Sequence, residues 1–183
     1  MNIPNVLSML RIVLIPLFII LISYRHPALA LAVFVLAAVT DGLDGCIARR
    51  FKMKTVLGSY LDPIADKLLL VSGFVTFALM GMLPRWLAIL VVSRDVIITV
   101  GIMILRLNAY QPEIRPSIMS KCNTVMQMVT ICLVLVVASG GSAGQLLPQL
   151  LAAACWITGM LTVLSGLHYI TRGLRLINER NGA

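Results

Sequence analysis

Residues 41–66 read DGLDGCIARRFKMKTVLGSYLDPIAD and hold four of the seven acidic residues of the chain. Asp41 lies three positions before Asp44, and Asp62 lies four positions before Asp66. On a helix, each of these spacings places both side chains on one face. Two such faces brought together would form a cage of four carboxylates, the kind of oxygen ligand that hard divalent cations such as Mg²⁺ prefer. Two metal ions held in this way suit displacement at a phosphorus centre.

The apolar flanks of this stretch argue against four unrelated surface carboxylates, because carboxylates within apolar segments are costly and usually functional. Between the two pairs, Gly42, Gly45 and Ala48 recur every three positions and leave one helix edge bare. Arg49 follows directly, and a guanidinium beside such an edge can bind a diphosphate bidentately. A bare edge is also typical of tight helix packing, so both interpretations stay open at this point.

The chain as a whole is far more apolar than a soluble domain, since 60% of its 183 residues are hydrophobic and only 12% are charged. We therefore expect an all-α integral membrane protein with six transmembrane helices in a single domain, residues 1–183. In chain order, the helices are expected at residues 12–22 with the flanking residues, 27–49, about 62–81, 85–107, 118–139 and 147–170. Asp62-Pro63 fits an N-cap followed by proline, but an earlier start of that helix, at Gly58 or before, would place Pro63 inside it.

Two further features have competing interpretations. An N-terminal signal peptide is suggested by Ala28-Leu29-Ala30, which resembles a cleavage site, but the basic region that precedes such a segment is lacking. The four cysteines lie in or beside apolar segments without the paired spacing of a zinc site, and we interpret them as small hydrophobic residues.

The net charge of +8 would suit a nucleic-acid binder, but in a membrane protein it more often marks the cytoplasmic face and anionic lipid. We expect membrane lipids and no nucleic acid as partners. With six spans, only Arg25 and Arg85 fall on one side, and ten cations fall on the other: Arg49, Arg50, Lys52, Lys54, Arg106, Arg115, Lys121, Arg172, Arg175 and Arg180. This asymmetry predicts that both termini and the active site are cytoplasmic, in an inner or plasma membrane.

The central stretch fits the pattern D-x2-D-G-x2-A-R-x8-G-x3-D-x3-D without a departure. It resembles the signature of the CDP-alcohol phosphotransferases, which are integral membrane enzymes that make phospholipids. Eight fixed positions within 26 residues make the resemblance specific, and they are Asp41, Asp44, Gly45, Ala48, Arg49, Gly58, Asp62 and Asp66.

The resemblance implies a six-helix bundle, a homodimer and a metal-dependent transfer, in which an acceptor hydroxyl attacks the β-phosphorus of a CDP-activated lipid and CMP leaves. It implies two Mg²⁺ ions, or Mn²⁺ in their place, held by Asp41, Asp44, Asp62 and Asp66, with Asp66 also the general base. The residues implied to bind CDP-diacylglycerol are Asn5, Ser8, Gly45, Ala48, Arg49, Thr55 and Gly58.

Within the family, the N-terminal N-I-P-N-x-L-S-x-x-R resembles both phosphatidylglycerol-phosphate synthases and CMP-forming cardiolipin synthases. S-R-D at 93–95, S-K-x-N-T at 120–124 and the final H-Y at 168–169 most resemble the cardiolipin synthases, whose acceptor is phosphatidylglycerol. Phosphatidylglycerol-phosphate synthases usually read G-K-x-K-T, and here Asn123 and Ile102 stand where cations are common. Fewer cations favour a phosphodiester acceptor over the dianionic phosphate of glycerol 3-phosphate, which is the alternative acceptor.

Four cations are expected to bind the acceptor: Arg94, Lys121, Arg106 and Arg115. An internal ion pair between helices is the alternative role of Arg94-Asp95, and Lys67 is expected to pair with a carboxylate. The polar stripe that opens the helix at 118–139 is expected to line an aqueous cavity. A cation transporter is the remaining alternative function, because carboxylates within membrane helices also mark ion pathways.

Overall fold

A computed structural model describes the backbone of residues 3–51, 56–107, 118–140 and 146–181, and the side chains of residues 10, 12–40, 67–101, 103, 118–140 and 146–171. Every regular element in its described part is a helix, and the described connections between helices are short turns. The elements are α1 (Ile3–Ser23), α2 (Pro27–Phe51), α3 (Val56–Leu79), α4 (Arg85–Leu107), α5 (Ile118–Ala138) and α6 (Leu146–Asn181).

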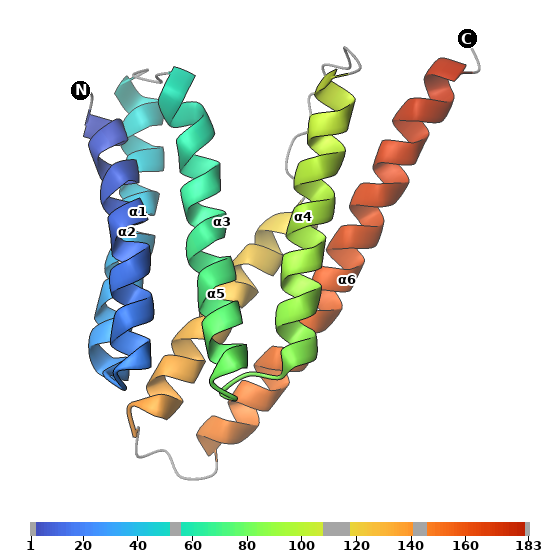
Figure 1. The fold of residues 1–183 in the computed structure, drawn as a ribbon. Helices are drawn as coiled ribbons and strands as arrows, with labels where there is room; N and C mark the ends of the chain where they lie inside the picture. Colours follow the sequence, from blue (N-terminus) through green and yellow to red (C-terminus); the bar gives the residue numbers. More distant parts are fainter. Residues whose placement is uncertain (1–2, 52–55, 108–117, 141–145, 182–183) are drawn as a thin grey trace.

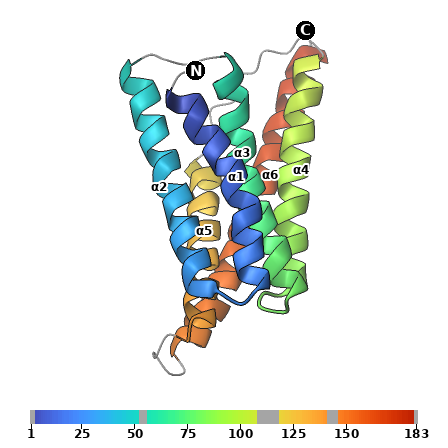
Figure 2. The same ribbon diagram turned by 60° about the vertical axis from the view of Figure 1, so that its left-hand side comes forward.

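The helices run up and down, so that alternate ends meet at the same end of the bundle (Figure 1). The start of α1, the end of α2, the start of α3 and the ends of α4 and α6 lie together at one end. A view turned by 60° shows the same arrangement (Figure 2). Both halves of the acidic stretch of residues 41–66 therefore lie toward the end of the bundle that carries both termini.

A left-handed glycine ends α3 at the opposite end of the bundle. Gly81 has a φ of 73°, and the amide of Met82 donates to the carbonyl of Phe77 at 2.8 Å. This is the Schellman arrangement, which only a residue without a Cβ adopts at no steric cost. It turns the chain sharply into α4, which begins at Arg85.

The predicted bounds of α4 are confirmed, and those of α2 and α5 lie within two residues of the prediction, but α1, α3 and α6 differ more, with α1 beginning at Ile3. α3 begins at Val56, so of the two starts left open the earlier one, at Gly58 or before, is confirmed; Asp62 and Pro63 lie inside the helix and Asp62 is not its N-cap. α6 continues to Asn181, whereas a basic tail was expected after residue 170. The prediction ended where hydropathy falls, but Arg, Leu and Glu are good helix formers and a helix does not stop at a change of polarity.

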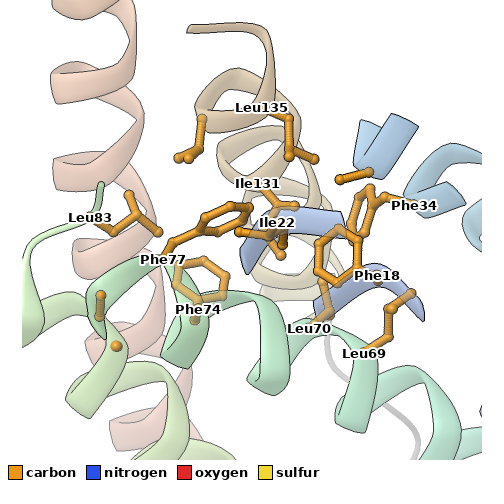
Figure 3. Close-up of a cluster of buried hydrophobic side chains, with 14 of the residues drawn as sticks. Phe18, Ile22, Phe34, Leu69, Leu70, Phe74, Phe77, Leu83, Ile131 and Leu135 are labelled. Atoms are coloured by element: carbon orange, nitrogen blue, oxygen red, sulfur yellow. The ribbon is translucent and has the colours of Figure 1, made fainter. Parts of the chain in front are cut away.

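An aromatic cluster packs α1 against α2 and α3, the two helices that carry the aspartate pairs (Figure 3). Phe18 of α1 lies 5.6 Å from Phe34 of α2 and 6.2 Å from Phe77 of α3, measured between ring centroids. α5 covers the cluster with Ile131, whose Cδ1 would be 3.0 Å from a Cβ added at Gly73 of α3. Such close packing resists sliding of α2 and α3 along α1, since even small volume changes in a packed core are costly.

A second contact joins α4 to α6 near the end of the bundle that lies opposite both termini. The rings of Trp86 and Trp156 are 5.2 Å apart, and Gly159 lies beneath Trp86, so closely that an added Cβ would be 2.7 Å from its Cζ3. Around this contact the outward side chains are apolar, and Ile89, Trp156 and Met160 are all exposed. An apolar outer surface is what lipid-facing helices require.

Within the described residues, two helical stretches are long and apolar enough to cross a membrane, Ile118–Ala138 and Leu146–Thr171. Three shorter apolar stretches lie in the first three helices, at Ile12–Ser23, Pro27–Thr40 and Lys67–Leu79. Six helices are thus confirmed, and the prediction that all six span the membrane stays a prediction.

Candidate active site

The four aspartates of the acidic stretch occupy two helices. Asp41 and Asp44 lie in the C-terminal half of α2, and Asp62 and Asp66 lie in the N-terminal half of α3. The helical backbone confirms that each pair lies on one helix face, since the spacings are three and four residues. Their side chains are outside the described set, so the cage of four carboxylates stays a prediction.

Most of the residues expected around this cage lie toward the same end of the bundle. Asn5 and Ser8 lie in α1, Gly45, Ala48 and Arg49 in α2, Gly58 in α3 and Arg106 in α4, each toward the end of the bundle that carries both termini. Thr55 and Arg115 lie outside the described residues. Among the side chains that the structure describes, no three histidines, cysteines or carboxylates form a metal-binding group.

A buried charge cluster includes Lys67, which directly follows Asp66, the last aspartate of the acidic stretch. Asp95 of α4 accepts two hydrogen bonds at the same oxygen, Oδ1, from Arg94 Nη1 at 2.6 Å and from Lys67 Nζ of α3 at 3.3 Å. Asp95 and Arg94 are both buried, whereas the Lys67 side chain is 39% exposed. The expected pairing of Lys67 with a carboxylate is confirmed, and the internal ion pair is confirmed as a role of Arg94-Asp95.

Arg94 also ties α4 to the last two helices. Its Nη2 donates to Ser120 Oγ of α5 and to Ser165 Oγ of α6, each at 2.8 Å. Of its donors, Nε is buried without a hydrogen-bond partner. The guanidinium is thus held from three sides by protein groups, which is the arrangement expected of a buried arginine that stabilises helix packing.

The polar stripe of α5 packs against α6. Asn123 Oδ1 accepts a hydrogen bond from Thr162 Oγ1 at 2.9 Å, and the hydroxyls of Thr130 and Thr158 lie 2.8 Å apart. Asn123 and Gln127 are 0% and 1% exposed. The prediction that this stripe lines an aqueous cavity is wrong for these two side chains, because both are buried in the protein; Asn123 accepts from Thr162, while Asn123 Nδ2 and Gln127 Nε2 have no hydrogen-bond partner.

Sequence reasoning missed the α6 side of this contact. Thr158, Thr162 and Ser165 are buried and recur at spacings of four and three residues, which is one helix face. That spacing was the available signal, and it was overlooked because hydroxyl residues are common and inconspicuous within apolar helices.

Lys121 is the one acceptor-binding candidate whose side chain is described apart from Arg94. It lies in the first turn of α5, directly after Ser120, and it is exposed. Exposure leaves its ammonium accessible to an anionic ligand, in contrast to the buried guanidinium of Arg94.

The family of the chain follows from comparison with known proteins. The sequence model of the CDP-alcohol phosphatidyltransferase family matches residues 1–164. The chain belongs to this family. It is therefore an enzyme of a membrane-bound family, which sets aside the cation-transporter alternative.

Its relatives carry two different names. It is 34% identical to a probable phosphatidylglycerophosphate synthase of Mycobacterium tuberculosis, over 95% of this chain and 82% of the relative. It is 34% identical to the CMP-forming cardiolipin synthase of Streptomyces coelicolor, over 97% of this chain and 85% of the relative. The human CMP-forming cardiolipin synthase is 31% identical over 97% of this chain and 64% of its own length. Similar identities to both kinds leave the acceptor to be inferred from the residues of this chain.

Proposed function

We propose that this enzyme transfers a phosphatidyl group from CDP-diacylglycerol to a hydroxyl of phosphatidylglycerol, giving cardiolipin and CMP. The observation that carries the choice of acceptor is the position of Asn123. Where related phosphatidylglycerol-phosphate synthases usually have a second lysine, this chain has a neutral amide that is completely buried and bonded to Thr162. The start of α5 thus offers Lys121 without a second cation, which suits the single charge of a phosphodiester.

Glycerol 3-phosphate is the second candidate acceptor. The name of the Mycobacterium tuberculosis relative favours it, because that protein is a probable phosphatidylglycerophosphate synthase of similar identity. The phosphate of glycerol 3-phosphate is dianionic, so it would gain from two cations where a phosphodiester gains from one.

The donor set of the acidic stretch fits the metal that the family implies. Four carboxylates without thiolate or imidazole are the ligands of hard cations such as Mg²⁺ or Mn²⁺. We propose that Asp41, Asp44, Asp62 and Asp66 hold two such ions. When bound, the ions supply charge stabilisation at phosphorus and lower the pKa of the attacking hydroxyl.

The other proposed roles belong to the chain itself. Asp66 takes the proton from the acceptor hydroxyl while the hydroxyl oxygen forms a bond to the β-phosphorus. The bond between the two phosphates then breaks and CMP leaves. Arg49 binds the diphosphate bidentately, with Gly45, Ala48 and Gly58 leaving room for it and with Asn5, Ser8 and Thr55 as polar contacts.

For the acceptor phosphate, we propose Lys121 with Arg106 and Arg115. We assign Arg94 to the framework of the protein, because its side chain is 7% exposed and its guanidinium is already bonded to Asp95, Ser120 and Ser165.

Replacing Lys121 by Ala is expected to raise the KM for phosphatidylglycerol by roughly 10- to 100-fold, because a charge-assisted hydrogen bond contributes roughly 1.5–3 kcal/mol. The KM for CDP-diacylglycerol should stay within about twofold. Initial rates of CMP release in mixed micelles, with each lipid varied in turn, measure both constants. Equal changes in the two KM values would show that Lys121 does not contact the acceptor. Arg85→Ala, an exposed cation at the other end of the bundle, is the matched control.

We also propose that the chain forms one catalytic domain of six transmembrane helices and works as a homodimer. Both termini and the active site would face the cytoplasm, because ten of the twelve cations outside the spans fall, by their position in the sequence, on the side of the termini if all six helices cross the membrane.

Single cysteines placed in a cysteine-free variant test this topology. Cysteines at positions 25 and 85 are expected to react with an impermeant maleimide added outside intact cells, and one at position 53 is expected to react only after the cells are opened. Labelling of position 53 from outside would contradict the six-span arrangement.

A further inference from the structure

Asp95 and four other side chains connect four helices. Its Oδ1 accepts from Lys67 of α3 and from Arg94 of α4, and Arg94 reaches Ser120 of α5 and Ser165 of α6. We call Lys67, Arg94, Asp95, Ser120 and Ser165 the four-helix hub. Its formal charge is +1, because two cations share one carboxylate.

The hub lies next to the proposed reaction centre along two helices. Lys67 directly follows Asp66 in α3, and Ser120 directly precedes Lys121 in α5. Residues adjacent on a helix differ by 100° of rotation and 1.5 Å of rise, so fixing one constrains the position of the other. The hub therefore connects the helix of the proposed base to the helix of the proposed acceptor contact.

The two links of Asp95 differ in strength. The Arg94 link is short and buried, whereas the Lys67 link is longer and the lysine is 39% exposed. A partly exposed ion pair contributes little to stability. Breaking the Lys67 link should therefore leave the fold intact while releasing the restraint on α3 next to Asp66.

We propose that Asp95 is a positioning residue for the transfer reaction: anchored by Arg94 to α4, α5 and α6, it holds Lys67 and thereby sets the position of Asp66. This inference rests on the proposed function, in which Asp66 is a metal ligand and the base. A side chain that orients a metal ligand typically changes metal affinity or activity by about 10- to 100-fold when it is removed.

The alternative is that Lys67 and Asp95 act only as charges near the metal site. Removing the cation Lys67 would then strengthen metal binding, because a repulsion is lost, and removing the anion Asp95 would weaken it. Positioning predicts the same direction for both variants, since either one breaks the same link. The sign of the change in metal affinity therefore separates the two explanations.

The experiment compares Lys67→Met, Asp95→Asn and the double variant as full-length protein in detergent. Binding of Mn²⁺ alone is measured by electron paramagnetic resonance, and CMP release is measured with CDP-diacylglycerol and phosphatidylglycerol. Both single variants are expected to bind Mn²⁺ and to turn over about tenfold more weakly, with KM values within about twofold. The double variant should bind Mn²⁺ and turn over no more weakly than the weaker single variant, because both substitutions break the same link.

Lys67→Arg should restore most of the activity, since a guanidinium can span a similar distance to Asp95, and Arg85→Met should behave as wild type. Asp95→Asn leaves Arg94 without its charge partner, and if it does not fold, Lys67→Met alone decides. Tighter Mn²⁺ binding in Lys67→Met, or unchanged binding and kcat, would overturn the inference. A wild-type protein that neither binds Mn²⁺ nor releases CMP would instead overturn the proposed function, and this inference with it.

Discussion

Asn in place of Asp66 is expected to lower the rate of CMP release by roughly 10²–10⁴-fold, the range over which a general base contributes to a reaction. An amide cannot accept the proton of the acceptor hydroxyl, and it is a weaker Mg²⁺ ligand than a carboxylate. The measurement is the initial rate of CMP release from CDP-diacylglycerol at saturating Mg²⁺. The fold should be retained, because Asn has nearly the shape of Asp and the change removes a charge from an apolar segment.

Two comparisons make this prediction specific. Asp62→Asn should be equally inactive through the loss of a metal ligand, whereas Glu179→Gln, an acidic residue outside the stretch, should keep wild-type activity. Near-normal turnover in Asp62→Asn or Asp66→Asn would remove the metal-dependent mechanism from the account.

Leu in place of Arg94 is expected to destabilise the folded protein by about 3–5 kcal/mol, the typical result of removing one partner of a buried ion pair. The change leaves the buried Asp95 with only the longer bond to Lys67. It also removes the hydrogen bonds that join α4 to Ser120 and Ser165. The free energy of unfolding in mixed micelles, titrated with a denaturing detergent, measures the effect.

The double variant Arg94→Leu with Asp95→Leu tests whether the loss comes from an unpaired charge. Removing both charges leaves the partly exposed Lys67 free to reach solvent, so the double variant should be more stable than Arg94→Leu alone. Arg85→Leu, at the exposed start of α4, should change stability by no more than about 0.5 kcal/mol. A loss in Arg94→Leu as small as that in Arg85→Leu would show that the four-helix hub does not hold the bundle together.

The helices were largely predictable because apolar segments broken by Pro, Gly and charged residues mark their own ends. Pro84 and Arg85 follow the turn at Gly81, and α4 begins where they predict. The start of α3 was not predictable from Asp62-Pro63, because the same two residues suit an N-cap or a helix interior next to a membrane surface. The end of α6 was missed for a similar reason, since hydropathy reports the membrane and not the helix.

The candidate site was also predictable only in part. Aspartates at spacings of three and four, with Gly, Ala and Arg at fixed places between them, form a local signal, and it identified the family before any contact was known. Arg94 gave no such signal, because Ser120 and Ser165 are 26 and 71 residues away along the chain. Partners at such separations are brought together only by packing of α4, α5 and α6, so the buried role and the acceptor role of Arg94 were equally compatible with the sequence.

The same holds for Asn123. The substitution of a neutral residue at a place where relatives carry lysine was visible in the sequence, but its burial against Thr162 was not. Asn123 is buried, and a lysine at this point of the α5–α6 contact would have to lose its hydration. The buried position therefore does not favour a second cation, which supports an acceptor of lower charge.

The identity of the acceptor tests the account most directly. Purified protein in mixed micelles with Mg²⁺ and CDP-diacylglycerol is supplied with either phosphatidylglycerol or glycerol 3-phosphate, and CMP and the lipid product are measured together. The account predicts rapid CMP release with phosphatidylglycerol and formation of cardiolipin, with little release when glycerol 3-phosphate is the acceptor. Rapid release with glycerol 3-phosphate and none with phosphatidylglycerol would contradict it.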